Sequence, residues 1–138
     1  MTIDDSAKAV LKDSRAIARN RAAQNADVID VLIAAVEASA RIKRALATMG
    51  VDWQDLIADA ASDNSPGRRR LLRRPIGFTP EAKGLLLRAS ALAAADSVSA
   101  VHMARAALGQ HDDLVTELLA ARGIDAERLI QALSDRDP

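Results

Sequence analysis

The chain contains two copies of one unit, and this duplication constrains the fold more than any other feature of the sequence. The second copy, Phe78 to Leu133, opens F-T-P-E-A-K-G-L-L, and the first, Ile3 to Ala60, opens I-D-D-S-A-K-A-V-L. Near the end of each copy, the segment LATMGVD at 46–52 recurs as LAARGID at 119–125. Matches that keep their order across short gaps indicate a duplication. Because each copy is longer than the short units that build solenoids, the sequence predicts a doubled domain and not a solenoid.

Apolar residues in the first copy recur at spacings of three and four, which is typical of amphipathic helices. A first helix is predicted over residues 4–20, with Asp4 as its N-cap, and a second over about 28–39. A third ends at Gly50, a residue type that suits the position after a helix C-terminus, and Asp52 caps a fourth. The apolar face of the first helix is predicted to consist of Ala7, Val10, Leu11, Ile17 and Ala18.

The second copy repeats this plan. Thr79 is a good N-cap, and Pro80 follows at the first helical position, where its missing N–H costs nothing. Further helices are predicted at about 99–108, 112–121 and 125–133, and no segment shows a strand pattern. The fold class is therefore predicted to be all-α, with eight helices as two pseudo-symmetric four-helix repeats in one compact domain. The buried stripe after Pro80 is predicted to be Ala82, Leu86, Ala89 and Ala93.

A segment rich in proline, glycine and arginine separates the copies. We expect one domain over residues 1–138, with repeat one at 3–61, an arginine-rich linker at 62–77 and repeat two at 78–134. The simpler interpretation of the linker is a solvated loop. The alternative is a docking strip for an acidic partner, because guanidinium groups bind carboxylates in a bidentate manner. That weaker partner-binding site would consist of Arg68, Arg69, Arg70, Arg73 and Arg74.

The bulk composition excludes several classes of function. The 19 basic and 19 acidic residues cancel, so no global field draws the chain onto nucleic acid or an anionic membrane. The absence of cysteine excludes disulfides, thiol catalysis and cysteine-ligated metals. The acidic start of the chain is unlike a secretory signal, and the longest apolar stretch, 31–36, is far shorter than the ~20 residues of a membrane span. These features predict a soluble, cytoplasmic protein.

The sequence offers no catalytic or cofactor motif. No phosphate-binding glycine loop is present, and the spacing of His102 and His111 is not that of a helical metal pair. His102 is predicted to be a partly buried, hydrogen-bonded residue, and His111 a surface residue. The paired carboxylates stand at predicted helix starts, where capping explains them. We therefore expect a non-enzyme that needs no cofactor and no metal.

A doubled unit whose second copy opens F-T-P-x-A-K, and whose two copies both close L-x-x-x-G-[IV]-D, resembles the Clp N-terminal repeat domain, although the first copy starts with Ile3 rather than Phe and has Asp30 in place of the histidine. That domain begins the ClpC- and ClpA-type Hsp100 unfoldases. The resemblance is strongest over the second copy, in Phe78-Thr79-Pro80 with Lys83, in His102 of the family's T-E-H-[IL]-L-L segment, and in Gly123-Ile124-Asp125. It implies a module that docks substrates and adaptor proteins above an ATPase ring and has no catalysis of its own. Since the ring modules are absent from the sequence, the chain looks like a free-standing Clp N domain.

The chain departs from the family at the positions that form the phosphoarginine pockets. The resemblance implies a glutamate in each T-E-H segment that pairs with the guanidinium, but the aligned residues here are Ile29 and Val101. A buried guanidinium without that carboxylate costs roughly 1–3 kcal/mol or more per site. Phosphoarginine recognition of the usual kind is therefore not expected.

A second family surface is kept. The resemblance implies that the starts of the first helices of the two repeats lie close together and bind cyclic peptide antibiotics in actinobacterial ClpC proteins. Phe78 and Lys83 match that site, and Ile3 and Lys8 are their pseudo-symmetric counterparts. Phe78 also stands where a hydrophobic staple at the start of a helix would place an apolar residue, and the two roles are compatible. The expected ligand-binding residues are Phe78, Lys83, Ile3, Lys8, Thr79, Pro80 and Glu81.

Three functions compete. The first is a non-catalytic binding module of the Clp protease system that captures peptides, adaptors or peptidic antibiotics, as a stand-alone decoy, regulator or adaptor of a ClpC-type unfoldase. The second is a nucleic-acid-binding protein that uses the arginine run, against which the zero net charge and the near absence of aromatic residues count. The third is a self-associating helical protein whose alanine-rich faces pair with further copies.

Overall fold

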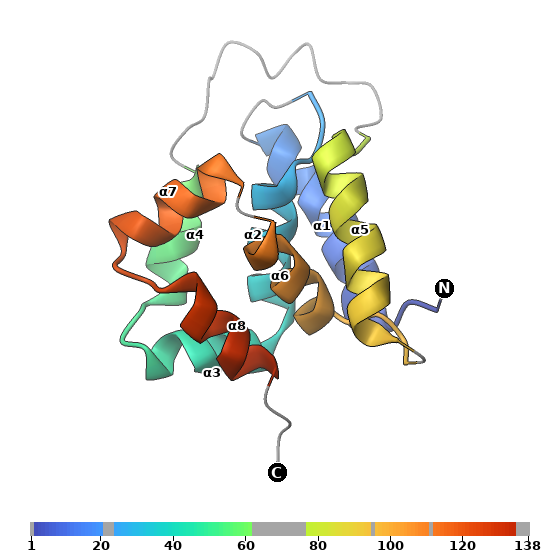
Figure 1. The fold of residues 1–138 in the computed structure, drawn as a ribbon. Coiled ribbons are helices and arrows are strands. Elements are labelled where there is room, and N and C mark those ends of the chain that lie inside the picture. The colour runs from blue at the N-terminus through green and yellow to red at the C-terminus, as the bar shows by residue number, and fades with distance from the viewer. Residues whose placement is uncertain (1, 21–23, 62–76, 95, 111, 135–138) are drawn as a thin grey trace.

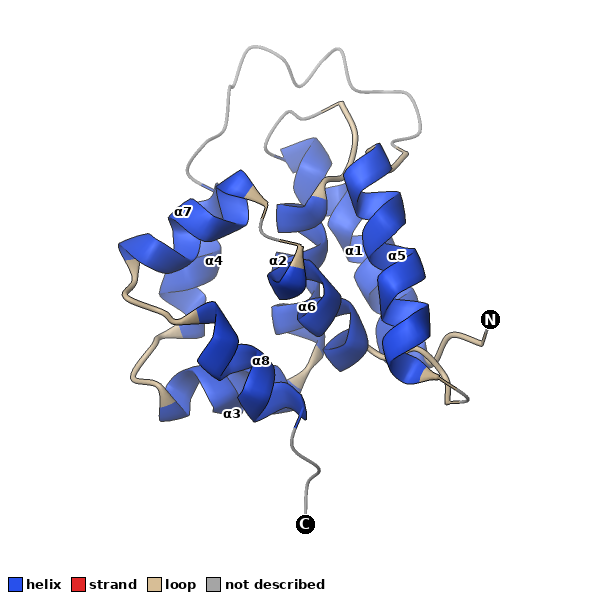
Figure 2. Cartoon of the chain, viewed as in Figure 1, coloured by secondary structure: helices blue, strands red, loops and turns tan. Residues whose placement is uncertain are grey.

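The described part of the chain folds into helices (Figures 1 and 2). The computed structural model describes residues 2–20, 24–61, 77–94, 96–110 and 112–134. The arginine run 68–74 and His111, for which the sequence predicted a linker and a surface residue, lie outside the described residues. The described helices are α1 (Asp5–Asn20), α2 (Val28–Ala38), α3 (Ala40–Thr48), α4 (Trp53–Ala61), α5 (Pro80–Ala93), α6 (Ala100–Gly109), α7 (Asp113–Ala121) and α8 (Ala126–Ser134).

The prediction of an all-α fold with eight helices is confirmed for the described residues. Their extended pairing is limited to two isolated bridges, Ile3 with Val98 and Ala26 with Phe78. The helix starts follow the predicted caps: the amide of Ala7 donates to the Asp4 carboxylate over 2.9 Å, and that of Ala82 to the Thr79 hydroxyl over 3.1 Å. Local capping chemistry therefore decides where these helices begin.

Helices α2 and α6 form the centre of the molecule, and they are equivalent in the two repeats. Figure 1 shows α1 and α5 on one side of them and α3, α4, α7 and α8 on the other. Every side chain from Val28 to Val36 is buried, as expected for a helix that is apolar on nearly all faces. On α6, fully buried alanines at 104, 106 and 107 permit close approach of neighbouring helices. The outer helices pair across the repeats, α3 with α8 and α4 with α7.

The two repeats end their third helices in the same turn. Gly50 and Gly123 follow α3 and α7 with φ of 77° and 66°, the left-handed conformation that glycine adopts without strain. In each turn the next residue donates back to the helix: the amide of Val51 to the Leu46 carbonyl, and that of Ile124 to the Leu119 carbonyl, both over 2.9 Å. The predicted role of both glycines is confirmed.

Each predicted apolar face packs on the core but lacks one fully buried residue. On α1, Ser14 is fully buried, whereas Leu11 and Ile17 are only half-buried. The Ser14 hydroxyl donates to the Leu11 carbonyl over 3.0 Å, which satisfies it inside the helix and lets a small polar side chain occupy a core position. On α5, Leu85 is fully buried and Leu86 half-buried, because the buried stripe runs through 82, 85, 89 and 93.

Candidate ligand-binding surface at the start of helix α5

The segments that precede four of the helices pair across the two repeats. Before α1 and α6, the amide of Asp4 donates to the Val98 carbonyl over 2.9 Å, and that of Val98 to the Thr2 carbonyl over 2.8 Å. Before α2 and α5, the amide of Ala26 donates to the Gly77 carbonyl, and that of Thr79 to the Ala26 carbonyl, each over 2.9 Å. Each pair joins a first helix of one repeat to the second helix of the other.

Thr79 has a structural role in this pairing. Its hydroxyl accepts from the amide of Ala82 and donates to the Asp27 carboxylate over 3.0 Å. The same carboxylate oxygen accepts from the amide of Val28, the first residue of α2, over 2.8 Å. One carboxylate thus connects the starts of α2 and α5. Among the predicted ligand-binding residues, Thr79 therefore uses its hydroxyl hydrogen in a structural bond to Asp27.

Phe78 is half-buried and packs against two alanines of repeat one, Ala18 and Ala26. The guanidinium of Arg15 lies 6.0 Å from the centroid of its ring, at the limit of a cation–π contact. A hydrophobic staple would need an apolar residue at the fourth helical position, and that position is Lys83, which is exposed. Phe78 is therefore anchored on helix α1 rather than by a staple within α5.

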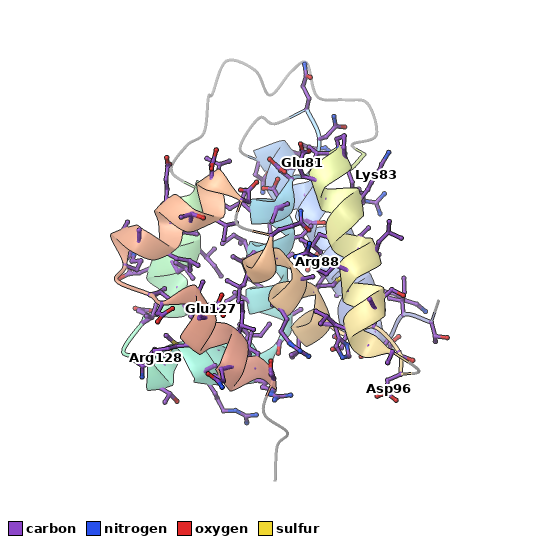
Figure 3. All side chains as sticks on the ribbon, in the orientation of Figure 1. Glu81, Lys83, Arg88, Asp96, Glu127 and Arg128 are labelled. Carbon is purple, nitrogen blue, oxygen red and sulfur yellow. The ribbon has the colours of Figure 1, made fainter. Side chains whose placement is uncertain are left out.

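Pro80, Glu81 and Lys83 are exposed on the first turn of α5. Figure 3 shows Glu81 and Lys83 together at this end of the helix. Two side-chain bonds fix α5 to the end of α6: the Gln110 Nε2 donates to the Glu81 carbonyl over 2.9 Å, and the Arg88 Nη1 to the Gly109 carbonyl over 3.0 Å. The exposed side chains therefore project from a fixed backbone. We call Arg15, Phe78, Pro80, Glu81 and Lys83 the Phe78 surface.

Ile3 and Lys8 lie at the opposite end of α5. Ile3 pairs with Val98, which follows α5, whereas Phe78 precedes α5. The 14 residues of α5 span about 21 Å at 1.5 Å per residue. Figure 3 shows Lys83 near one end of α5 and Asp96 just beyond the other. The expectation that the starts of the two first helices lie close together is therefore wrong: α1 and α5 run in opposite directions (Figure 1), and the expected residues lie in two groups at the two ends of α5.

A basic stripe on α1 was not singled out from the sequence. Four basic side chains at spacings of four, three and four are exposed on one face of the helix: Lys8, Lys12, Arg15 and Arg19. The third of them, Arg15, lies over the Phe78 ring. The signal was present, because positions i, i+4, i+7 and i+11 share a helix face. On α5, exposed Leu87 has 70% of its surface accessible and follows Lys83 by one helical turn. We call the α1 set the basic stripe: Lys8, Lys12, Arg15 and Arg19.

His102 and Asp30 occupy equivalent positions in the two repeats, as the third residues of α6 and α2. The amide of Ser99 donates to the His102 Nδ1 over 3.0 Å, and that of Asp27 to the Asp30 Oδ2 over 2.9 Å. Burial lowers the pKa of His102 below 6.5, and the positive charge of Arg105 lowers it further. The prediction of a partly buried, hydrogen-bonded histidine is confirmed. That Asp30 would be buried was not foreseen.

The described residues hold no cluster of three or more histidine, cysteine or acidic side chains that could bind a metal ion. Ile29 lies in the hydrophobic core, and half-buried Val101 packs against it. None of the described helices has the length and apolar character needed to cross a membrane.

The helices, their caps and the crossed pairing define an all-helical domain built from two four-helix repeats. The sequence profile of the Clp repeat (R) N-terminal domain family matches residues 2–101, and the chain belongs to this family. Domains of this family are non-catalytic modules that bind substrates and adaptors in Hsp100 systems.

The fold is similar to that of a solved structure. The chain matches the crystal structure of the Hsp104 N-terminal domain from Candida albicans with a TM-score of 0.80 and a sequence identity of 14%. It covers 96% of this chain and 89% of that chain, so the two share the fold. A comparison with curated protein sequences gave no match.

Proposed function

We propose that the chain is a binding module of the Clp protease system that captures a peptide or protein ligand at the Phe78 surface. The observation that carries this proposal is the Arg15–Phe78 contact beside exposed Lys83. An aromatic ring that is packed on one side and bordered by cations is a pre-organised contact for a ligand, since little side-chain freedom is lost on binding.

The charges around this surface favour an acidic ligand. Arg15 of the basic stripe lies over the ring, exposed Lys83 adds a cation on the first turn of α5, and exposed Leu87 offers an apolar contact one turn along α5. A segment with a carboxylate and an apolar side chain complements both features. Cyclic peptide antibiotics are a further ligand class for the same surface.

The module acts in this proposal as a stand-alone decoy, regulator or adaptor of a ClpC-type unfoldase. Apolar Ile29 and Val101 replace the carboxylates that would pair with a phosphorylated arginine. A decoy needs only the ligand surface, and a domain that has lost the arginine pockets while keeping Phe78 and Lys83 fits that role.

Calorimetric titration with a cyclic peptide that binds ClpC N domains tests the proposal. We expect binding by the wild-type protein, none by Phe78→Ala, and about tenfold weaker binding by Lys83→Ala. Lys8→Ala is the matched control, because Lys8 is the equivalent lysine in repeat one and lies at the other end of α5. Equal losses for the two lysine variants, or full binding by a folded Phe78→Ala, would contradict the Phe78 surface.

The basic stripe also favours a second candidate, a nucleic-acid-binding protein that places these cations on phosphates. The zero net charge counts against it. Titration with duplex DNA at low and high salt separates the two, since binding to phosphates weakens steeply as salt is added. Self-association, the third possibility, is tested by sedimentation, where a strictly monomeric species would remove it.

A further inference from the structure

The connection from α7 to α8 in repeat two reproduces that from α3 to α4 in repeat one. Besides the shared glycine turn, the residue before each fourth helix caps it in the same way. The Asp52 Oδ1 accepts from the amide of Gln54 over 2.9 Å, and the Asp125 Oδ1 from the amide of Glu127 over 3.0 Å. The first residues of α4 and α8 therefore occupy equivalent positions on the backbone.

The side chains at these positions differ. The first residue of α4 is Trp53, which is half-buried against the core, and the Lys43 ammonium lies 4.3 Å from the centroid of its ring. The first residue of α8 is Ala126, and Thr116 stands where repeat one has Lys43. Both matches follow from the alignment of LATMGVD with LAARGID. Both replacements remove volume from the same place.

Repeat two has a pocket at this place. It has a volume of about 250 Å³, is partly open to solvent, and is lined by residues that include Leu108, Thr116, Leu119, Ile124 and Ala126. For comparison, an apolar cavity of about 150 Å³ inside a protein binds benzene. The equivalent place in repeat one holds Trp53, so the first repeat shows which kind of group this backbone accommodates.

We propose that this pocket binds an aromatic side chain, preferentially the indole of a tryptophan, presented by a partner polypeptide. This chain has no further aromatic residue to fill it. Trp53 and Phe78 are its only tryptophan and phenylalanine, it has no tyrosine, and both rings are packed in repeat one or against it. A second copy has the same two packed rings, so the ring comes from a different protein. The pocket is lined by the end of α6, by α7 and by the start of α8, where Figure 3 labels the next residue, Glu127, and none of its lining residues belongs to the Phe78 surface.

Methyl NMR with N-acetyltryptophanamide tests the pocket directly. We expect saturable shifts of the Ala126, Leu119 and Ile124 methyl groups, with a dissociation constant of about 1–10 mM for this single-residue probe. N-acetylleucinamide should give shifts several-fold smaller at equal concentration. The Phe78→Ala variant should retain them, which separates this site from the proposed ligand surface.

Ala126→Trp supplies the missing ring from within the chain. It should abolish the probe shifts and raise the melting temperature by about 2–5 °C, since the indole fills a pocket already present. Ala91→Trp, on the exposed face of α5, is the control and should do neither. Ala126→Leu, a smaller filling, should weaken the probe if the tryptophan variant does not fold. Absent shifts at about 10 mM probe, or shifts that persist in folded Ala126→Trp, would overturn the proposal.

Discussion

The guanidinium of Arg15 lies 6.0 Å from the centre of the Phe78 ring, so repeat one supplies the cation that borders the aromatic residue of repeat two. The relationship is not repeated at the other end of the domain. The residue equivalent to Phe78 is Ile3, and in the same alignment the position equivalent to Arg15 is Ser90. Pseudo-symmetry in the backbone is therefore combined with asymmetry in the chemistry, and the two ends of α5 differ in what they can bind.

The Arg15 contact predicts a specific effect on ligand binding. Arg15→Ala should weaken binding at the Phe78 surface by about two- to fivefold, because an exposed cation–π contact is lost together with one charge. Arg19→Ala removes an equal charge from the same stripe without removing the contact, and it should have the smaller effect in calorimetry at physiological salt. If the two variants lose affinity equally, only the summed charge matters and the ring contact does not.

The Thr79 hydroxyl predicts a loss of stability rather than of binding. Thr79→Ala removes the cap of α5 and the bond to Asp27 at once, and we expect the free energy of unfolding to fall by about 1–2 kcal/mol. Urea denaturation measures this change. Thr79→Ser keeps the hydroxyl and should recover most of the loss. An equal loss in both variants would assign the effect to the methyl group.

The lowered pKa of His102 predicts a pH-dependent stability. In the folded state Nδ1 accepts from Ser99, so the neutral ring is favoured, whereas the unfolded chain titrates near the ordinary value of 6.5. The contribution is fully present above pH 6.5 and is lost as the pH falls toward the lower folded pKa, since the unfolded chain binds the proton first. Between about pH 7.5 and pH 5, the urea midpoint should thus fall further for the wild type than for His102→Gln, whose amide oxygen still accepts from Ser99. Parallel decreases would show that His102 does not contribute.

The residue that ends α5 predicts a stabilising substitution. Ala94 has φ of 54° and ψ of −115°, a conformation that strains any residue with a Cβ. Ala94→Gly should raise the free energy of unfolding by about 1 kcal/mol, because relief of this strain exceeds the added entropy of the unfolded chain. Gly50→Ala is the reverse test. An added Cβ there meets nothing within 4 Å, so a loss would come from the positive φ alone. Stability unchanged by Ala94→Gly would contradict the strain.

The parts of the fold that depend on neighbouring residues could be predicted from the sequence. Helix starts at Asp4 and Thr79 and the turns at Gly50 and Gly123 follow from capping and backbone preference, which act within a single helical turn. The separation of Ile3 from Phe78 could not, because it depends on which flanking segments pair between the two repeats. The burial of Ser14 was missed for another reason: a serine can satisfy its hydroxyl within its own helix, and hydrophobic patterning does not register that.

The candidate sites divide in the same way. Phe78 and Lys83 were found because the motif around them is local, while Arg15 joins them only through the packing of α1. The pocket at Ala126 could not be predicted from the sequence either. The change from Trp53 to Ala126 is visible when the repeats are aligned, but neither the ring of Trp53 nor the space beside Ala126 can be located without the packing of α7 and α8.

The crossed pairing before the helices bears on how such a chain could have arisen. Ile3 with Val98 and Phe78 with Ala26 are one contact made twice, once in each direction. A contact that is returned in this way is the mark of an isologous interface, the kind that holds together a two-fold symmetric homodimer. The domain therefore has the geometry of a dimer whose subunits have become covalently joined. Once joined, the halves no longer had to stay identical, and one could carry a tryptophan where the other carries an alanine without disturbing the interface they share.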